Sequence, residues 1–136
     1  MEQIAVSLTP ADRMILESYK TMAEGLSDYL GSGYEIVLHS LENLDRSVIK
    51  ILNGYHTGRR EGAPITDLAL EMLARIKETG GDPPYISYFT KNKRDEPLKS
   101  TTIAIHGERG RVIGLMCMNF YLNTPLADVI SSLTPR

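Results

Sequence analysis

A long apolar run near the C-terminal end of the chain places the strongest constraint on its fold. Residues 111–122 read RVIGLMCMNFYL, and hydrophobic side chains occupy both odd and even positions. A strand with apolar residues on alternate positions needs cover on one face, whereas a strand apolar at every position is covered on both. We therefore predict a central strand. The helical side of the domain would cover one face, and the N-terminal helix, a second subunit, or both would cover the other.

Four further segments predict strands that join this one in a sheet. Residues 85–92 and 98–106 are rich in branched and aromatic side chains, and the turn GERG makes a hairpin of 98–106 and the final run. Upstream, 34–42 and 47–53 have the same character, and the turn residues NLDR between them predict a second hairpin.

An N-terminal helix is predicted from Thr9, a capping residue, Pro10 at the first helical position and Asp12 in the first turn. Gly31 is expected to end it. Its apolar seam has alternating steps of four and three: Ile15, Tyr19, Met22, Leu26 and Tyr29. This seam packs either on the domain's own sheet or against a second copy of the chain, and two heptads do not separate these alternatives.

A second helix is predicted at 67–78, with Thr66 as its cap and TGGDPP as its terminator. Its inward face comprises Ile65, Leu68 or Ala69, Met72, Leu73 and Ile76. The order is then one helix, two strands, a helical crossover and three antiparallel strands. This order predicts an α+β domain with a five-stranded antiparallel sheet and flanking helices, as in PAS or GAF-like sensors.

The composition of the chain fits a single cytoplasmic domain. With 136 residues and 42% hydrophobic content, a core forms without a disulfide or metal staple. The net charge of −2 argues against this segment wrapping nucleic acid. No signal peptide or membrane-spanning run is apparent, and the one cysteine, Cys117, suits a reducing compartment.

Two stretches carry a family resemblance: VIKILNGYHTGRREGAPITDLAL and LKSTTIAIHGERGRVIGLMCMNFYLN. From about Tyr34 to Leu122 the chain resembles the YheO-like PAS domain of bacterial helix-turn-helix transcriptional regulators. The resemblance implies a PAS-like sensory domain followed by a C-terminal DNA-binding domain. Only fourteen residues follow Leu122, so the DNA-binding domain is absent from residues 1–136. We expect an excised sensory domain rather than a natural stand-alone one, because ISSLTPR ends without a terminal element of its own.

The glycine-rich segment 53–62, NGYHTGRREG, is predicted to connect the second strand to the crossover helix. A phosphate-binding loop needs a lysine beside a hydroxyl at the start of a helix, which this segment lacks. Two arginines are also too few for a DNA-binding face. Arg59 either meets an anionic ligand or clamps a carboxylate within the fold, and the general weakness of lone surface arginines favours the clamp.

Metal and catalytic sites are not expected. The possible metal ligands are His39, His56, His106 and Cys117, and they lie on different predicted elements without CxxC or HxxxH spacing. Cys117, in an apolar strand, is expected to be an inert thiol. No acid–base or nucleophile–base pair appears at useful spacing, so we predict no enzyme activity. The sequence lacks the polar helical cysteine motif of flavin-binding PAS domains and has no helical histidine for a haem, so we predict no cofactor or prosthetic group.

Polar residues on apolar strands are the better candidates for a binding pocket. Asn119 interrupts the most hydrophobic strand, and a buried amide needs a hydrogen-bond partner. That partner is either a neighbouring strand group or a small polar ligand between sheet and helices. The predicted ligand-binding residues are His39, Ser100, Thr102, Asn119 and Arg59.

These observations support one leading hypothesis and two alternatives. The first is a sensory and dimerisation domain that binds a small metabolite, forms a homodimer and reaches DNA only through the absent C-terminal domain. The second is a purely structural dimerisation module without a ligand. The third, a small enzyme, is disfavoured. No membrane contact is expected.

Overall fold

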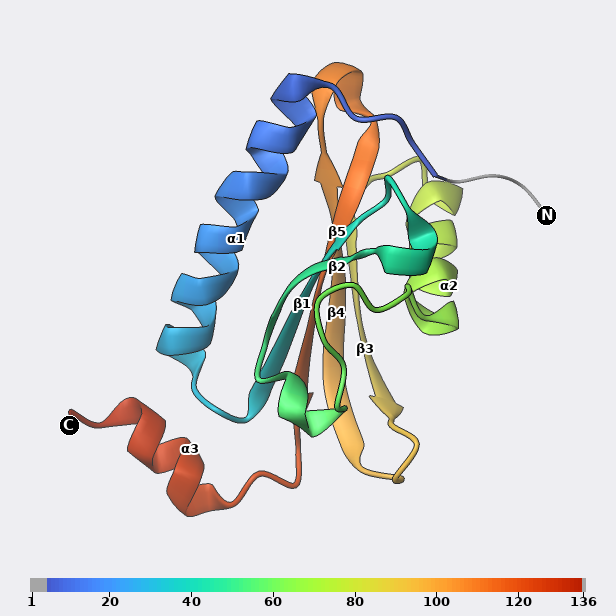
Figure 1. Cartoon of the computed structure of the whole chain (residues 1–136). Helices are drawn as coiled ribbons and strands as arrows, with labels where there is room; N and C mark the ends of the chain where they lie inside the picture. Colours follow the sequence, from blue (N-terminus) through green and yellow to red (C-terminus); the bar gives the residue numbers. More distant parts are fainter. Residues whose placement is uncertain (1–4, 136) are drawn as a thin grey trace.

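Strand β5 (Val112–Tyr121) lies at the centre of a five-stranded antiparallel sheet, as the apolar run predicts. The strand order is β2-β1-β5-β4-β3, so the first and last strands of the chain, β1 and β5, are neighbours in the sheet. This computed structural model describes residues 5–135 (Figure 1). The other strands are β1 (Tyr34–Ser40), β2 (Val48–Leu52), β3 (Tyr85–Lys91) and β4 (Pro97–His106). The predicted PAS-like α+β fold and both hairpins are confirmed.

Helix α1 (Pro10–Leu30) begins where the sequence predicts and lies along one face of the sheet (Figure 1). Thr9 and Asp12 form a reciprocal capping box, in which each side chain accepts a hydrogen bond from the other's backbone N–H. The predicted seam divides. Ile15, Tyr19 and Leu26 pack on the sheet, whereas Met22 and Tyr29 are 51% and 80% exposed. The domain's own sheet therefore accounts for most of the seam.

The first turn of α1 is fastened to the β4–β5 hairpin by a buried carboxylate. Asp12 accepts hydrogen bonds from the backbone N–H of Glu108, at 2.8 Å, and from the guanidinium of Arg111. These donors, with the amide of Thr9 contributing most, hold the pKa of Asp12 at about 2 against the opposing effect of burial. Gly107 is needed here because a Cβ would lie 2.2 Å from the Asp12 Oδ1.

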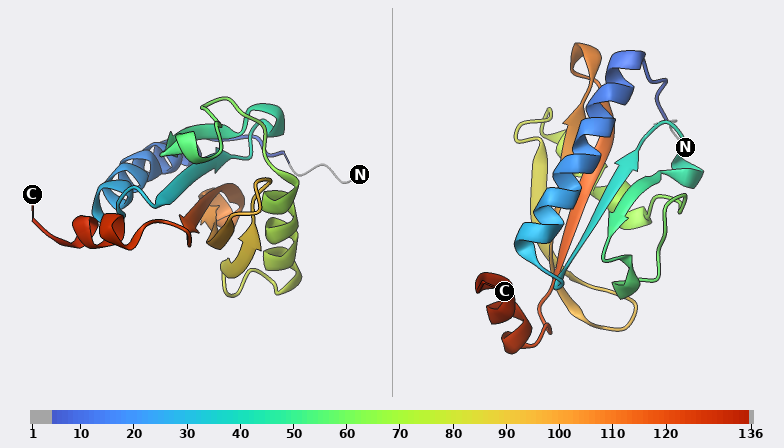
Figure 2. Two further views of the ribbon diagram at one scale, coloured as in Figure 1. Left: turned by 90° about the horizontal axis from the view of Figure 1, so that it is seen from below. Right: turned by 60° about the vertical axis from the view of Figure 1, so that its left-hand side comes forward.

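Helix α2 (Asp67–Glu78) covers the opposite face of the sheet, near β3 and β4 (Figure 2). Thr66 is its cap, accepting a hydrogen bond from the Ala69 amide at 3.1 Å. The helix buries Ala69, Met72, Leu73 and Ile76, so Ala69 rather than Leu68 completes the predicted inward face.

The chain has a terminal element that the sequence analysis missed. Helix α3 (Leu126–Leu133) follows β5 and buries none of its residues. The expectation that the C-terminal segment lacks an element of its own is therefore wrong. The signal was present in the apolar spacing of Leu126, Val129, Ile130 and Leu133. Within residues 5–135, no helix is both long enough and apolar enough to cross a membrane.

Candidate functional site

The two faces of the sheet differ because alternate residues of each strand point to opposite sides. One face, here called the α1 face, carries Ile36 and Leu38 of β1 and lies under helix α1. The other, here called the pocket face, is covered only in part by α2. It carries Glu35, Val37 and His39 of β1, Ser100 and Thr102 of β4, and Cys117 and Asn119 of β5.

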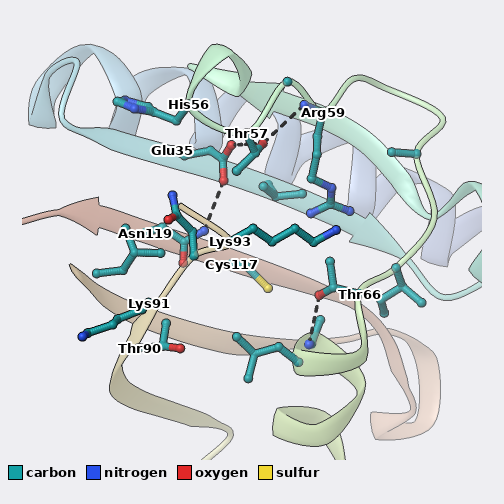
Figure 3. A pocket seen from close by; sticks show the side chains of 18 of the residues that line it. Glu35, His56, Thr57, Arg59, Thr66, Thr90, Lys91, Lys93, Cys117 and Asn119 are labelled. Carbon is teal, nitrogen blue, oxygen red and sulfur yellow. Dashed lines mark hydrogen bonds between the residues drawn. The ribbon is translucent and has the colours of Figure 1, made fainter. Parts of the chain in front are cut away.

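A cavity of about 850 Å³ lies over the pocket face. Its floor is β1 and β5, and its walls are the segment around the short 3-10 helix η2 (Gly54–His56), the start of α2 and the β3–β4 turn (Figure 3). The glycine-rich segment is thus more than a connection, because Thr57, Gly58 and Arg59 line the cavity. A volume of this size falls within the range of small-molecule sites.

A chain of hydrogen bonds runs across one end of the cavity floor. The Ser100 hydroxyl donates to Asn119 Oδ1 at 2.8 Å, and Asn119 Nδ2 donates to Glu35 Oε1 at 3.2 Å. The Thr57 hydroxyl donates to Glu35 Oε2 at 2.6 Å (Figure 3). Glu35 is only 1% exposed, so this carboxylate is held inside the domain by neutral donors.

His39 sits at the other end of β1, four residues from Glu35. The imidazole is 1% exposed, and its Nδ1 lies 2.8 Å from the Ser47 hydroxyl. Burial, reinforced by the positive charge of Arg59, lowers the pKa of His39 from 6.5 to about 4. The ring is therefore neutral at physiological pH and serves as a hydrogen-bonding group.

Cys117 lies in the floor between these two ends, opposite Val37 of β1. Burial raises the pKa of its thiol to about 11, so the thiolate is scarce at neutral pH. Thr102 lies 3.6 Å from the Cys117 sulfur and 3.2 Å from the Tyr88 hydroxyl. The predicted burial of Cys117 is confirmed, and its lack of reactivity stays a prediction.

Two cationic side chains, those of Arg59 and Lys93, also line the cavity. Arg59 donates from Nη2 to the Pro64 carbonyl at 2.7 Å and forms no salt bridge with any carboxylate of residues 5–135. The favoured carboxylate clamp for Arg59 is therefore wrong: the guanidinium holds a backbone carbonyl of its own loop. Lys93, on the β3–β4 turn, extends its side chain into the cavity (Figure 3).

Contacts of His56 connect the η2 segment, which lines the cavity, to β5, to the segment before β1 and to the β3–β4 turn. The His56 ring stacks on Tyr121 with centroids 4.0 Å apart, and its Nε2 lies 2.8 Å from the Ser32 carbonyl oxygen. Arg94, on the β3–β4 turn, donates to the His56 carbonyl oxygen. The η2 segment and the β3–β4 turn are thus joined across the opening.

Three of the five predicted ligand-binding residues line the cavity, and the other two lie beside it. His39, Arg59 and Asn119 line it, while Ser100 and Thr102 lie buried beside it and hydrogen-bond to residues that line it. Sequence reasoning missed Glu35 and Lys93. A charged residue inside an apolar strand, on the same face as His39, was a usable signal for Glu35. No comparable signal distinguished Lys93 from any other turn lysine.

The four possible metal ligands remain separated. His106 is exposed at the end of β4, His56 stacks at the mouth, and His39 and Cys117 lie on different strands of the floor. In the described part of the chain, no three side chains of the metal-binding types come together.

Comparison with known proteins gives a consistent family. The family model described as "YheO-like PAS domain" matches residues 9–135. The chain is 48% identical over 122 residues to YheO of Escherichia coli (strain K12), covering 89% of this chain and 50% of that protein. It is 43% identical to a Haemophilus influenzae (strain ATCC 51907 / DSM 11121 / KW20 / Rd) protein, covering 90% of this chain and 54% of that protein. The chain thus spans about half the length of these relatives.

Solved structures support the fold. The PAS domain of a protein from Colwellia psychrerythraea aligns with a TM-score of 0.50 at 16% identity, covering 77% of this chain and 97% of that one. A structure of an RsLOV variant aligns with a TM-score of 0.51 at 14% identity, covering 89% and 75%. With the family model and the sequence relatives in agreement, the chain belongs to the YheO-like PAS domain family.

Proposed function

We propose that this domain is the sensory and dimerisation domain of a bacterial transcriptional regulator, and that it binds a small metabolite in the cavity of the pocket face. The observation that carries the proposal is the cavity itself, whose floor holds a few convergent polar groups among apolar ones. The family resemblance supports the regulatory role. In this proposal the domain is cytoplasmic, catalyses no reaction and reaches DNA through a part of the regulator outside these residues.

Ligand binding produces a signal only if the ligand prefers one arrangement of the domain over another. The floor of the cavity offers a route for this preference, because Glu35 and Asn119 lie on the two central strands that also carry the α1 face. A ligand that alters their hydrogen bonds acts on the strands beneath α1. Helix α1 is then the element that reports occupancy.

Thermal-shift screening of metabolites, including amino acids and small carboxylates, tests the sensory proposal. We expect at least one to raise the melting temperature. Thr90→Trp, which fills the cavity from β3, should abolish this response. Ser87→Trp, on the outward side of the same strand, should preserve it and serves as the control. A library without a single hit, tested on folded protein, would refute ligand sensing.

The second candidate, a structural dimerisation module, is favoured by the internal partners of the polar floor. Asn119 is satisfied by Ser100 and Glu35, and Thr102 by Tyr88, without any ligand. This candidate predicts a dimer and no response to any metabolite. The thermal-shift screen therefore decides between the two candidates.

The dimerisation part of the proposal assigns the contact to the outward stripe of α1. Met14, Met22 and Tyr29 are 74%, 51% and 80% exposed on that side. Exposed apolar stripes of this kind are typical of interaction surfaces. Sedimentation equilibrium of Met22→Glu should show a monomer, and Ser18→Glu, between Met14 and Met22 on the same stripe, should weaken the dimer as well. A Leu26→Glu change is a poorer test, because Leu26 packs on the sheet and its loss perturbs folding itself.

A further inference from the structure

We propose that the cavity accepts a bipolar organic solute, with a cationic nitrogen at the Glu35 end and an acid group at the end formed by Arg59 and Lys93. The inference rests on the proposed ligand-binding function and specifies its ligand class. The two charged groups of such a solute are several bonds apart. The reasons lie in the two ends of the cavity and in the space between them.

The first end holds a carboxylate without a cation. Glu35 lines the cavity and is 1% exposed, yet its two hydrogen bonds come from the neutral Thr57 hydroxyl and Asn119 amide. No lysine, arginine or histidine nitrogen within residues 5–135 lies within 4.0 Å of it. Burying a carboxylate beside neutral donors alone costs free energy, and a ligand ammonium or guanidinium would offset that cost.

The second end holds cations without carboxylates. Among the basic residues that line the cavity, Lys91 pairs with Asp95 and Arg94 with Glu96. Arg59 and Lys93 form no such pair with any of the described carboxylates. Figure 3 shows the Lys93 side chain reaching across the cavity toward the Arg59 guanidinium. Two like charges that converge without an anion between them form a site for a carboxylate or phosphate.

The two ends are separated along the cavity. Figure 3 shows the Arg59 guanidinium apart from the Glu35 carboxylate, with the Lys93 side chain running toward the guanidinium. Arg59 acts on His39, because its charge helps to lower the pKa of that imidazole. Cys117 lies between and feels both charges: Arg59 lowers the pKa of its thiol and Glu35 raises it. The cavity therefore has a negative end, a neutral apolar middle and a positive end.

This charge distribution discriminates between ligand classes. A dicarboxylate that reaches both ends sets one carboxylate against Glu35, and a diamine sets one ammonium against Arg59 and Lys93. Like-charge contacts of this kind inside a protein are costly, so both classes are disfavoured relative to a solute with opposite charges at its two ends.

Isothermal titration calorimetry of the wild-type domain tests the charge pattern directly. The probes are ω-amino acids of increasing chain length, together with the dicarboxylic acids and diamines of the same lengths. At the best length, the ω-amino acid should bind at least about tenfold more tightly than either symmetric probe. A dicarboxylate or diamine that binds as tightly as the ω-amino acid would overturn the inference.

Two variants assign the ends of the ligand. Glu35→Gln should weaken ω-amino acid binding about tenfold to a hundredfold and remove the preference over the dicarboxylate. Lys93→Met should instead reduce the preference over the diamine. The matched controls are Glu61→Gln, which is exposed and outside the cavity, and Lys99→Met, on the α1 face of β4; both should bind like wild type. Circular dichroism establishes that each variant is folded, and Lys93→Met, an exposed position, remains informative if Glu35→Gln does not fold.

The outcomes separate this inference from the proposed function. If the ω-amino acids do not bind and the metabolite screen finds a ligand of another charge class, the bipolar class is wrong and ligand sensing stands. If neither the probes nor the screen yields binding to folded protein, ligand sensing itself fails. If Glu35→Gln and Lys93→Met both keep the wild-type order of probe affinities, the inference is also contradicted, because the charges of Glu35 and Lys93 would then not determine which probe binds.

Discussion

The α1 face and the pocket face are built from the same strands but are used differently. On the α1 face, Leu16 and Ala23 of the helix close over Ile36, Leu38 and Met116, and all five are at most 4% exposed. On the pocket face, α2 covers only the β3–β4 side and a cavity remains over β1 and β5. The comparison shows that packing on one face of a sheet can supply most of the core, while the other face keeps a cavity in which a ligand can bind.

The physical origin of the difference lies in how closely each helix approaches. Gly114 of β5 lets α1 come near, because a Cβ there would lie 2.9 Å from Leu16 Cδ2 and 2.5 Å from the His39 carbonyl oxygen. The α1 face also contributes apolar side chains at nearly every core position. The pocket face places Glu35, His39 and Asn119 among its apolar residues, and these polar groups do not pack against a helix without partners.

The sharpest test of the comparison is a pair of leucine truncations. Leu16→Ala on the α1 face should lower the free energy of unfolding by about 2–5 kcal/mol, because the cavity it leaves is closed on all sides. Leu98→Ala on the pocket face should cost about 2 kcal/mol, because the space it vacates joins a cavity that already exists. Urea denaturation measures both, and an equal loss in the two variants would contradict the proposed asymmetry.

A second test uses the pH dependence of stability conferred by His39. Its pKa is lowered to about 4 in the folded domain, so the unfolded chain binds the proton more readily. Stability is therefore complete above about pH 6.5 and is lost as the pH falls toward about 4, by about 3 kcal/mol in total. Denaturation midpoints should fall with pH across that range in wild type but not in His39→Gln, and parallel pH profiles of the two proteins would contradict the assignment. The same burial explains why the ring is a neutral partner in the pocket.

The third test concerns the carboxylate that fastens α1. The pKa of Asp12 is held at about 2, below its ordinary value of 3.8, so its contribution to stability is present above about pH 4 and is lost as the pH falls toward 2. Asp12→Asn should lower stability at neutral pH and flatten the acid limb of the profile. Glu17→Gln, an exposed change on the same helix, is the control. An acid limb identical to that of wild type would argue against this role for Asp12.

The smallest effect on stability is expected at the positive end of the cavity. Lys93→Met should change the free energy of unfolding by no more than about 0.5 kcal/mol, because Lys93 is exposed and forms no salt bridge with the described residues. A larger loss, measured by the same denaturation method, would indicate a structural role for Lys93. A small loss of stability together with an altered ligand preference would show that Lys93 contributes to ligand binding and not to folding.

Much of the fold was predictable because its signals are local. The apolar run at 111–122, the caps Thr9 and Thr66 and the breaker TGGDPP each act within a few residues, and the structure confirms the elements they predict. Helix α3 was missed although its apolar spacing was visible. It buries no side chain, so its apolar spacing forms an exposed stripe and not a part of the core pattern from which the other two helices were predicted.

The candidate site was predictable only in part. His39 and Asn119, both predicted to be pocket residues, do lie on the pocket face. The neutral partners of Glu35, the loop carbonyl held by Arg59 and the reach of Lys93 depend on segments far apart in the chain, and no spacing rule reports them.

The sequence by itself determined the five strands, the two main helices and the face on which each strand residue lies, because hydrogen bonding and side-chain alternation are properties of the local chain. Only the tertiary structure decided that α1 closes one face and that α2 leaves the other open. Only the folded chain brings Glu35, from β1, and Lys93, from the β3–β4 turn, to the same cavity. Packing distances between helices and sheet, rather than any local pattern, made one face a core and the other a candidate binding site.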